Sequence, residues 1–353
     1  MAPVTMRQIA ETAEVSIGTV SHVINGTAKV RDKLRQRVLD AIRKLGYQPS
    51  QLARGLRRNR TSMLVMMMPD VTNPFFPAVV RGVEDVAYKG SLRLVLCNTD
   101  NDPRKEISYL NELQSYRPAG WLVIPAVDSE IAPHLKSGHW PPVVCIDRRP
   151  EGWSGDVVLV ANEAGAYSAT EYLLRMGHRR LAVITGPLHL ANAVERLRGF
   201  QRALAKAKVA IEPDYIQEAR FDRDSGYQAA TRLLGMLPRP TAIFACNDLM
   251  ALGVLLAARE LGFDCPKDLS IVGFDNLDFA EFTAPALTTV HQSGYQLGTT
   301  AARALLERIG GLQEPPKRVV LPTELKIRSS VASISDGRGR STPKARRAAV
   351  VAR

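Results

Sequence analysis

The strongest constraint on the fold is an alternation, from Met63 onward, of short apolar runs with amphipathic stretches of helical periodicity. Each run is apolar at nearly every position, so both faces of the strand that it forms must be covered. Strands of this kind that alternate with helices form parallel sheets with helices on both faces. The expected strands are residues 63–68, 92–97, 120–125, 143–146, 157–160, 181–185, 242–246 and 269–274. The expected helices are residues 77–89, 104–115, 164–176, 193–208, 226–235, 249–261 and 295–309.

This number of strands exceeds one open sheet, so we expect an α/β body made of two doubly wound parallel-sheet subdomains. The chain is expected to pass between them near Asn162 and again within residues 285–292. The body is expected over residues 62–335, with an N-subdomain of residues 62–161 and 291–322 and a C-subdomain of residues 162–290.

Polar and aromatic residues follow several of the expected strands. Ligands of doubly wound sheets bind at the carboxyl ends of the strands, so these residues are candidates for one site. Carboxylates, amides and an arginine beside aromatic rings suit a polyhydroxylated ligand, because vicinal hydroxyls need paired donors and acceptors. The residues concerned are Asp70 to Phe76, Asp100, Asp147, Asn192, Arg196, Phe221, Asn247, Asp248, Asp275 and Asn276.

Several of these residues also have a purely structural interpretation. Asp248 and Asn162 are expected to cap the helices that follow them. Phe75 and Phe76 have core packing as an alternative, and Arg196 has a surface position as its alternative. Convergence of these side chains on one cavity is what would distinguish a binding site from caps and core.

The formal net charge of +12 is concentrated at the two ends of the chain. Residues 1–61 hold 12 Lys and Arg against 4 Asp and Glu, and residues 336–353 hold 6 against 1. The 274 residues between them have a net charge of −1. A basic head on a nearly neutral body indicates a polyanionic partner for the head. The basic tail, residues 336–353, has the composition of a disordered segment.

The basic head has the spacing of a helix-turn-helix unit. Thr5 and Gln8 can form a capping box for a first helix, and Ser16 can cap a second helix that ends before Gly26. A third helix is expected over residues 32–45. On spacing alone, a small three-helix bundle with a solvated basic face is the alternative. The residues expected to be buried in the second helix are Ile17, Val20, Val23 and Ile24.

Residues 50–61 form a basic connector that contains four arginines. Ser50 can cap one short helix there, but a helix of this length is not stable alone in water. An ordinary basic linker is the alternative.

The head resembles that of the lactose/purine repressor (LacI) family, in the segments 5–10, 15–26 and 45–49. The resemblance implies an all-α helix-turn-helix head over residues 1–49 and a hinge helix over residues 50–61, whose leucine wedges into the minor groove. It implies that Ile17, Gly18 and His22 contact bases. The DNA-binding positions that it implies are Thr5, Ser16, Ile17, Gly18, Thr19, Ser21, His22, Asn25, Lys29, Arg54 and Leu56.

Two head residues depart from the family pattern. His22 stands where arginine is usual, and a histidine donates to guanine singly rather than as a bidentate pair. Glu14 stands where Gly or Asn is usual, because this turn favours a left-handed backbone.

The body resembles the same family through about residue 332, which implies the fold of periplasmic sugar-binding proteins. The segments that carry this resemblance are 73–76, 147–148, 177–179, 186–187, 247–248 and 273–276 together with Arg196. Leu190 stands where purine-binding members have a basic residue, so we expect a sugar rather than a nucleobase. For Arg148, a contact with the carboxylate of a sugar acid and a solvent-facing position are both open. The effector-cleft residues that the resemblance implies are Phe75, Phe76, Asp147, Arg148, Asn192, Arg196, Phe221, Asn247 and Asp275.

The sequence contains no catalytic constellation, metal-ligand spacing or phosphate loop, so we expect no enzyme activity and no cofactor. Its four cysteines show no close pairing, which is typical of reduced thiols in the cytosol. No apolar run reaches the length of a membrane span, and the first residues lack the pattern of a signal peptide. We therefore expect a cytoplasmic protein without a membrane partner.

The sequence predicts a DNA-binding transcriptional regulator, a repressor that binds a pseudo-palindromic operator as a homodimer under the control of a small sugar-like effector. Effector binding is expected to bias the angle between the subdomains and thereby the pairing of two hinge helices. Further pairing of dimers into tetramers stays open. The alternatives are a global regulator controlled mainly by a phosphorylated partner protein and a solute-binding protein without a DNA role.

Overall fold

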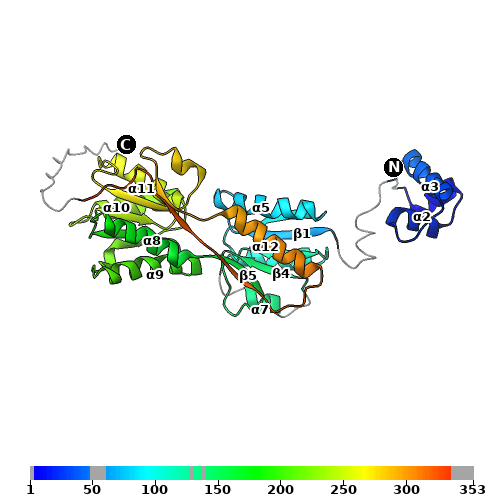
Figure 1. Cartoon of the computed structure of the whole chain (residues 1–353), viewed down its shortest axis with the longest axis horizontal. Coiled ribbons are helices and arrows are strands. Elements are labelled where there is room, and N and C mark those ends of the chain that lie inside the picture. Colours follow the sequence, from blue (N-terminus) through cyan, green and yellow to red (C-terminus); the bar gives the residue numbers. More distant parts are fainter. Residues whose placement is uncertain (1–3, 48–60, 128–130, 137–139, 335–353) are drawn as a thin grey trace. The chain divides into compact units, whose positions relative to one another are not determined.

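The structure is a computed structural model that describes residues 4–47, 61–127, 131–136 and 140–334 (Figure 1). The helical head falls into one compact unit, and the two sheets of the body fall together into another. The expected hinge residues Arg54 and Leu56 and the basic tail lie outside the described residues.

The head consists of α1 (Met6–Ala13), α2 (Ile17–Asn25) and α3 (Asp32–Leu45). The capping box is confirmed, since the Thr5 amide donates to the Gln8 side chain at 2.8 Å and the Gln8 amide donates to the Thr5 hydroxyl. Ser16 caps α2 by accepting a hydrogen bond from the Thr19 amide. The fully buried side chains at the centre of the three helices are Ile9, Val20 and Val38.

The prediction that Ile17 is buried is wrong, because its side chain is 49% exposed. Ile17 is the first residue of α2, and helical side chains point back toward the N-terminus of their helix. The side chain therefore extends beyond the turns that could cover it. Val23 and Ile24, about two turns later, pack against the head core as expected.

The turn between α1 and α2 accommodates Glu14 in the left-handed conformation, with φ of 49°. The Glu14 amide donates to carbonyls of the last turn of α1 and so ends that helix. Its carboxylate accepts a hydrogen bond from Arg37 of α3 at 2.6 Å. The unusual residue at this position thus gains an ion pair that joins the turn to α3.

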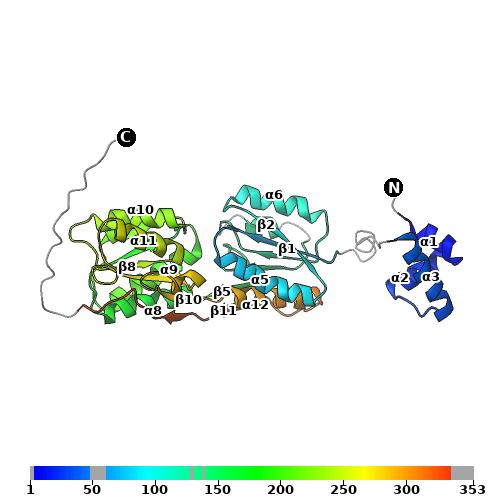
Figure 2. The same cartoon turned by 90° about the horizontal axis from the view of Figure 1, so that it is seen from above.

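The body contains two six-stranded sheets, called sheet A and sheet B (Figures 1 and 2). Sheet A consists of β1 (Met63–Met68), β2 (Arg93–Asn98), β3 (Gly120–Val123), β4 (Val143–Ile146), β5 (Asp156–Val160) and β11 (Arg318–Leu321), in the order β11-β5-β4-β3-β1-β2. Sheet B consists of β6 (Leu181–Thr185), β7 (Ile216–Glu218), β8 (Ala242–Ala245), β9 (Ser270–Asp275), β10 (Thr288–His291) and β12 (Glu324–Lys326), in the order β12-β10-β9-β8-β6-β7.

Helices cover both sheets, as expected for doubly wound folds (Figure 2). Those that accompany sheet A are α5 (Phe75–Lys89), α6 (Pro103–Gln114), α7 (Ile131–Lys136) and α12 (Gly294–Ile309). Those that accompany sheet B are α8 (Asn162–Arg175), α9 (Ala191–Lys206), α10 (Arg223–Leu234) and α11 (Asp248–Glu260). Two short 3-10 helices, Pro213–Tyr215 and Asp278–Glu281, also lie in the second half of the body.

Every strand and helix predicted for the body is present, with ends that agree within three residues. The sequence analysis missed β7, β10, β11, β12 and α7. Strands β7 and β12 have three residues each, β11 is a half-exposed edge strand and β10 begins with two threonines, so none shows a long apolar run. The β12 strand also pairs with β10 in antiparallel orientation, against the expectation of purely parallel sheets.

The chain passes between the sheets three times, after β5, after β10 and after β11. The first two passages lie at the predicted places, at Asn162 and at the end of residues 285–292. The third passage, from β11 to β12, follows strands that the sequence pattern did not show. Elements far apart in sequence therefore meet at the boundary between the sheets.

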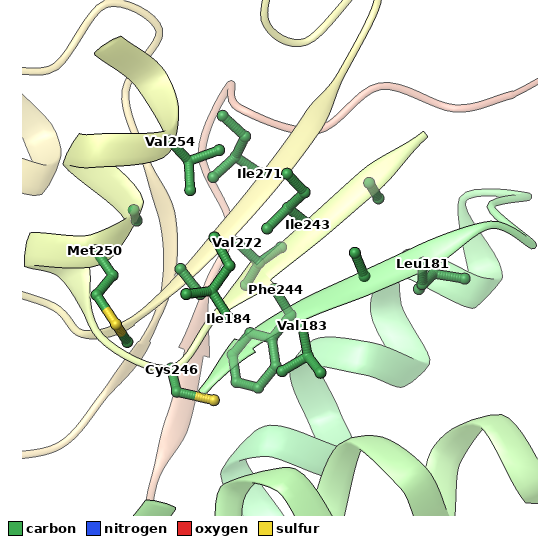
Figure 3. Close-up of a cluster of buried hydrophobic side chains, with 14 of the residues drawn as sticks. Leu181, Val183, Ile184, Ile243, Phe244, Cys246, Met250, Val254, Ile271 and Val272 are labelled. Atoms are coloured by element: carbon green, nitrogen blue, oxygen red, sulfur yellow. The ribbon is translucent and has the colours of Figure 1, made fainter. Parts of the chain in front are cut away.

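Sheet B is held by a dense apolar core (Figure 3). Side chains of β6, β8 and β9 meet those of α11, among them Val183, Phe244, Val272 and Val254, which are all fully buried. The polar residues at the carboxyl ends of these strands are thereby fixed on a rigid support.

In the N-terminal half of the body, α5 and α12 lie side by side with their backbones almost in contact (Figure 1). A Cβ atom added to Gly298 would lie 2.0 Å from the Val79 carbonyl oxygen, and one added to Gly82 would lie 2.2 Å from the Tyr295 carbonyl oxygen. Only glycine permits this approach.

We predict that Gly298→Ala lowers the free energy of unfolding by about 1–3 kcal/mol, because the two helix backbones must separate. Gly235→Ala is the matched control, since a Cβ there meets carbonyl oxygens no closer than 3.5 Å. Urea unfolding of both variants measures the difference. Equal stability of the two variants would contradict the close packing.

Candidate functional site

A cavity of about 950 Å³ lies at the carboxyl ends of strands from both sheets. All nine residues expected in an effector cleft line it, which the sequence alone could not establish. Six of them have charged or amide side chains, and three are phenylalanines, of which two begin α5. The nine are Phe75, Phe76, Asp147, Arg148, Asn192, Arg196, Phe221, Asn247 and Asp275.

Several lining residues adopt the left-handed backbone conformation that L side chains rarely take. Asp147 has φ of 64°, Phe221 has φ of 63° and Asp275 has φ of 116°. Asp100 and Asn101, which also line the cavity, have φ of 54° and 56°. Such conformations cost about 1–3 kcal/mol each and persist only where the surroundings hold them. Their concentration here indicates a site in which side-chain direction is fixed at the expense of backbone strain.

Hydrogen bonds from the start of α11 hold the strained residue Phe221 and the loop that follows Asp275. The Asn247 side chain caps α11 through the Met250 amide and donates to the Phe221 carbonyl at 2.9 Å. The predicted cap role of Asp248 is therefore wrong, since Asn247 occupies the cap position. The Asp248 carboxylate accepts instead from the Leu277 amide at 2.8 Å and from the Thr289 hydroxyl at 2.6 Å. It thereby anchors the loop that follows Asp275.

Arg196 is a buried residue of α9 and not a surface arginine, with 3% of its surface exposed. Its Nε donates to Asn162 Oδ1 at 2.8 Å, and its Nη1 donates to the Cys246 carbonyl at 2.5 Å. The guanidinium carbon lies 3.8 Å from the ring centre of Phe274. The predicted cap role of Asn162 is wrong as well, because its side chain serves Arg196 and Glu195 rather than the amides of α8.

Asp275 faces Arg196 at 3.7 Å and accepts a hydrogen bond from Gln292 Nε2 at 2.5 Å. Burial raises the pKa of the Asp275 carboxyl to about 7, against the opposing effects of Arg196 and Gln292. Burial and the nearby Asp275 carboxyl also raise the pKa of Asp248 well above its usual value. The floor of the cavity therefore holds less negative charge at neutral pH than its composition suggests.

Arg148 forms hydrogen bonds and an ion pair with other residues of the body. Its Nη1 donates to the Pro125 carbonyl at 2.7 Å and to the Asn101 side chain at 3.3 Å, and its Nε lies 3.8 Å from Asp147. Only 3% of Arg148 is exposed, so the solvent-facing alternative is wrong. These hydrogen bonds fix the loop that carries Asn101 beside the cavity.

Three buried oxygen atoms of the cleft have no hydrogen-bond partner among the described residues: Asp147 Oδ1, Asn192 Oδ1 and Gln292 Oε1. The amide orientations follow from their neighbours, because Asn192 Nδ2 donates to Asp147 and Gln292 Nε2 donates to Asp275. An ionised carboxylate can only accept hydrogen bonds, so each amide must turn its NH2 group toward its carboxylate partner. The amide oxygens are therefore left for a ligand. A molecule with several O–H or N–H donors would satisfy all three.

Gln292 was missed by the sequence analysis. It follows β10, which the sequence pattern did not show as a strand, so the rule about residues after strands was not applied to it. It lies within the predicted passage 285–292, and this was the available signal.

The hydrogen bond between Asn192 and Asp147, 3.0 Å long, connects the two halves of the body. Asp147 follows β4 of sheet A, whereas Asn192 belongs to the first turn of α9, which packs on β6 of sheet B. The two halves are therefore joined at the cavity by side chains that also offer free acceptors to a ligand.

Aromatic rings supply the apolar part of the cavity. Phe75 and Phe76 pack edge to face with ring centres 5.4 Å apart, and the Asn73 side chain accepts from the Phe75 amide to fix the start of α5. Both rings are at least nine-tenths buried, and both line the cavity. These two residues therefore belong both to the buried core and to the wall of the cavity.

In the head, most polar side chains of α2 hydrogen-bond locally. The Ser16 and Thr19 hydroxyls lie 3.0 Å apart, and the Asn25 side chain donates to the Ser21 carbonyl at 2.8 Å. His22 is exposed and its Nδ1 lies 2.9 Å from the Thr27 hydroxyl, which leaves Nε2 without a partner in the described head. The other exposed candidates are Thr5, Ser16, Ile17, Gly18 and Lys29.

In the described ranges, no group of His, Cys, Asp and Glu could hold a metal ion. No helix of these ranges is both long and apolar enough to cross a bilayer.

Two protein-family models match the chain. The family of bacterial regulatory proteins, lacI family, matches residues 5–50, and the periplasmic binding protein-like domain matches residues 170–331. The HTH-type transcriptional repressor PurR of Mannheimia succiniciproducens is 38% identical over 332 residues, which cover 94% of this chain and 99% of the relative.

Solved structures resemble the chain over nearly its whole length. The lac repressor dimer bound to operator and the anti-inducer ONPF has a TM-score of 0.85 at 26% identity, over 94% of this chain and 100% of that chain. The complex of the transcriptional regulator CelR with cellobiose has a TM-score of 0.72 at 31% identity, over 93% of this chain and 99% of that chain.

The raised pKa of Asp275 predicts that the free energy of unfolding depends on pH. Between the ordinary value of about 4 and the value of about 7 in the fold, the native state binds more protons than the unfolded state. Stability contributed by this group is present at low pH and is lost as pH rises through that window. Asp275→Asn removes this dependence, so the variant should gain stability relative to the wild type between about pH 4 and about pH 7.

Urea unfolding across this range measures the effect, with Asp278→Asn as the control at an exposed carboxyl nearby. A stability difference between Asp275→Asn and the wild type that stays constant with pH would contradict the assignment.

Proposed function

The chain belongs to the LacI family of bacterial transcriptional repressors, and we propose that it acts as a homodimer on a pseudo-palindromic operator under the control of a sugar-like effector. Like its relatives, it is a repressor and not an enzyme. The observation that carries the proposal is a cavity between the two sheets that is lined by buried polar groups and still has free acceptors. We further propose that it works in the cytoplasm, on bacterial DNA.

The chemistry of the cavity favours an uncharged effector that is rich in donors. Arg196 is paired with Asp275, and Arg148 is engaged by backbone carbonyls and lies near Asp147. The cavity also contains further carboxylates, so an anionic ligand would meet net repulsion. Hydroxyl groups of a neutral sugar could donate to the three free oxygens while its apolar ring face packs on phenylalanine.

A sugar is proposed in preference to a purine base for two reasons. Leu190 is 2% exposed and apolar, and it stands where the resemblance implies a basic residue in purine-binding members. The similarity to the CelR–cellobiose complex also supports a sugar. The relatives named PurR make purine bases a necessary comparison in any ligand screen.

The effector is proposed to act by closing the cavity. Asp147 and Asn192 come from the two halves of the body and offer one free oxygen each. A ligand that donates to both oxygens binds best when the halves are close, so it shifts the population toward the closed arrangement. Coupling energies of this kind are typically about 1–3 kcal/mol.

We propose that the closed arrangement affects DNA binding through the hinge, residues 50–61. In this proposal Leu56 wedges into the minor groove, with Arg54 beside it, and two hinge segments fold there as paired helices. The likeness to the lac repressor dimer bound to operator supports a dimer on DNA. In the head, exposed lysines and arginines such as Lys29, Arg31 and Arg35 suit phosphate contacts.

A thermal-shift screen tests the effector class, with and without operator. The panel contains neutral pentoses, hexoses and disaccharides, sugar acids, sugar phosphates, and the bases hypoxanthine and guanine. We expect a neutral sugar to raise the melting temperature, because a ligand at 100 times its Kd adds about 2.7 kcal/mol of stability. A purine base or a phosphorylated sugar as the best ligand would contradict the sugar proposal. A response only to a phosphorylated partner protein would favour the alternative of a global regulator.

We predict that Arg196→Ala abolishes the response to the sugar while operator binding without the sugar persists. Because this variant leaves Asp275 unpaired and can be unstable, Gln292→Ala is the second variant. It removes one free acceptor and should weaken sugar binding about tenfold.

Arg202→Ala is the control for both variants, since Arg202 lies on the same helix as Arg196 with an exposed side chain. Isothermal titration with the sugar measures the affinities. Unchanged sugar binding in both test variants would rule out the assigned cleft.

A further inference from the structure

Two large apolar side chains of the head, Ile17 and Leu39, take no part in its apolar core. Among the large apolar side chains of residues 4–47, only Ile17 and Leu39 are exposed, at 49% and 37%. Ile17 takes no part in the apolar cluster at the centre of the three helices. Its exposure therefore contributes nothing to the stability of the head.

The polar side chains around Ile17 hydrogen-bond within the head. The hydroxyl of Ser16, which precedes Ile17, accepts from the Thr19 amide at 3.1 Å and lies 3.0 Å from the Thr19 hydroxyl. Ser21, one turn beyond Ile17, is contacted by the Asn25 side chain at its carbonyl and its hydroxyl. At the start of α2 the side chain of Ile17 is thus exposed, while the neighbouring hydroxyl groups are hydrogen-bonded within the head.

Gly18 adds a second, independent feature. A Cβ atom there would meet only the Ser16 hydroxyl, at 3.6 Å, and the backbone is not left-handed. The head therefore does not require glycine at this position, although glycine in a helix costs about 1 kcal/mol relative to alanine. A missing side chain at this exposed point lets an external surface approach the helix next to Ile17.

We propose that Ile17 recognises a thymine of the operator through the C5-methyl group. This inference rests on the proposed function of operator binding, and it takes the first turn of α2 to lie in the major groove, as in other helix-turn-helix units. The thymine methyl group is the one apolar group that the base pairs present in that groove. An aliphatic side chain beside a glycine can pack on it, whereas cytosine in the same position presents a polar amino group and no methyl.

The inference names a base at one position in each half of a pseudo-palindromic operator, because a dimer presents two copies of α2. Burial of one methyl group contributes about fourfold in affinity. Loss of the methyl group from both half-sites should therefore weaken binding about fifteenfold, if the two contributions add.

The test uses the full-length protein and a duplex that it selects from a random-sequence pool. Each thymine of the selected half-site is replaced in turn by deoxyuridine, which differs only in lacking the methyl group. We expect one position at which this replacement weakens binding about fourfold per half-site. In Ile17→Ala the loss at that position should disappear, while the effects at all other positions stay as in the wild type.

Leu39→Ala is the matched control, because it removes the other exposed apolar side chain of the head, on α3. It should keep the full deoxyuridine effect. Circular dichroism of both variants checks that the head stays folded, which the exposure of Ile17 leads us to expect.

Three outcomes would overturn the inference while leaving the repressor function intact. The first is a deoxyuridine effect that is equal in the wild type and Ile17→Ala. The second is a selected half-site in which no thymine replacement matters. The third is an Ile17→Ala variant that loses affinity equally for operator and random duplex. Selection of no preferred sequence at all would instead refute the proposed function itself.

Discussion

The buried pairing of Arg196 with Asp275 is the interaction around which the cleft is built. A guanidinium removed from water is tolerated only when its charge and its N–H groups are satisfied. Here they are met by Asp275, by the Asn162 side chain and by the Cys246 carbonyl, with Phe274 against its face. These partners belong to α8 and to the ends of β8 and β9, so one arginine fixes the relative positions of several elements at the cavity.

The requirement that a buried arginine be paired and hydrogen-bonded also determines which groups of the cleft remain for a ligand. Because the buried arginines are engaged by the protein itself, the buried groups of the described cleft that remain for a ligand are oxygen acceptors on Asp147, Asn192 and Gln292. The head follows a comparable pattern, since most polar side chains of α2 hydrogen-bond internally and Ile17 and His22 remain for an external partner. In both sites the protein satisfies most of its own groups, and the ligand is recognised by the few that are left.

Much of this arrangement was predictable from sequence wherever the signal is local. Long apolar runs predicted the principal strands, and Thr5 and Ser16 predicted two helix starts. The positions of polar residues after strands and at a helix start, together with the family resemblance, predicted nine cavity residues. The roles of Asn162 and Asp248 were not predictable, because their partners Arg196 and Thr289 lie more than thirty residues away in sequence. The exposure of Ile17 depends on the direction of its side chain at a helix end, and the apolar spacing of α2 does not reveal this.

The central claim is that effector binding in the cleft and binding to operator DNA are energetically linked. Fluorescence anisotropy of a labelled operator with the full-length protein, without and with a saturating neutral sugar, measures this linkage most directly. The account predicts that the sugar changes operator affinity by about 5–150-fold and that operator changes sugar affinity by the same factor. Identical operator affinity in the presence and absence of a sugar that demonstrably binds the cleft would contradict it.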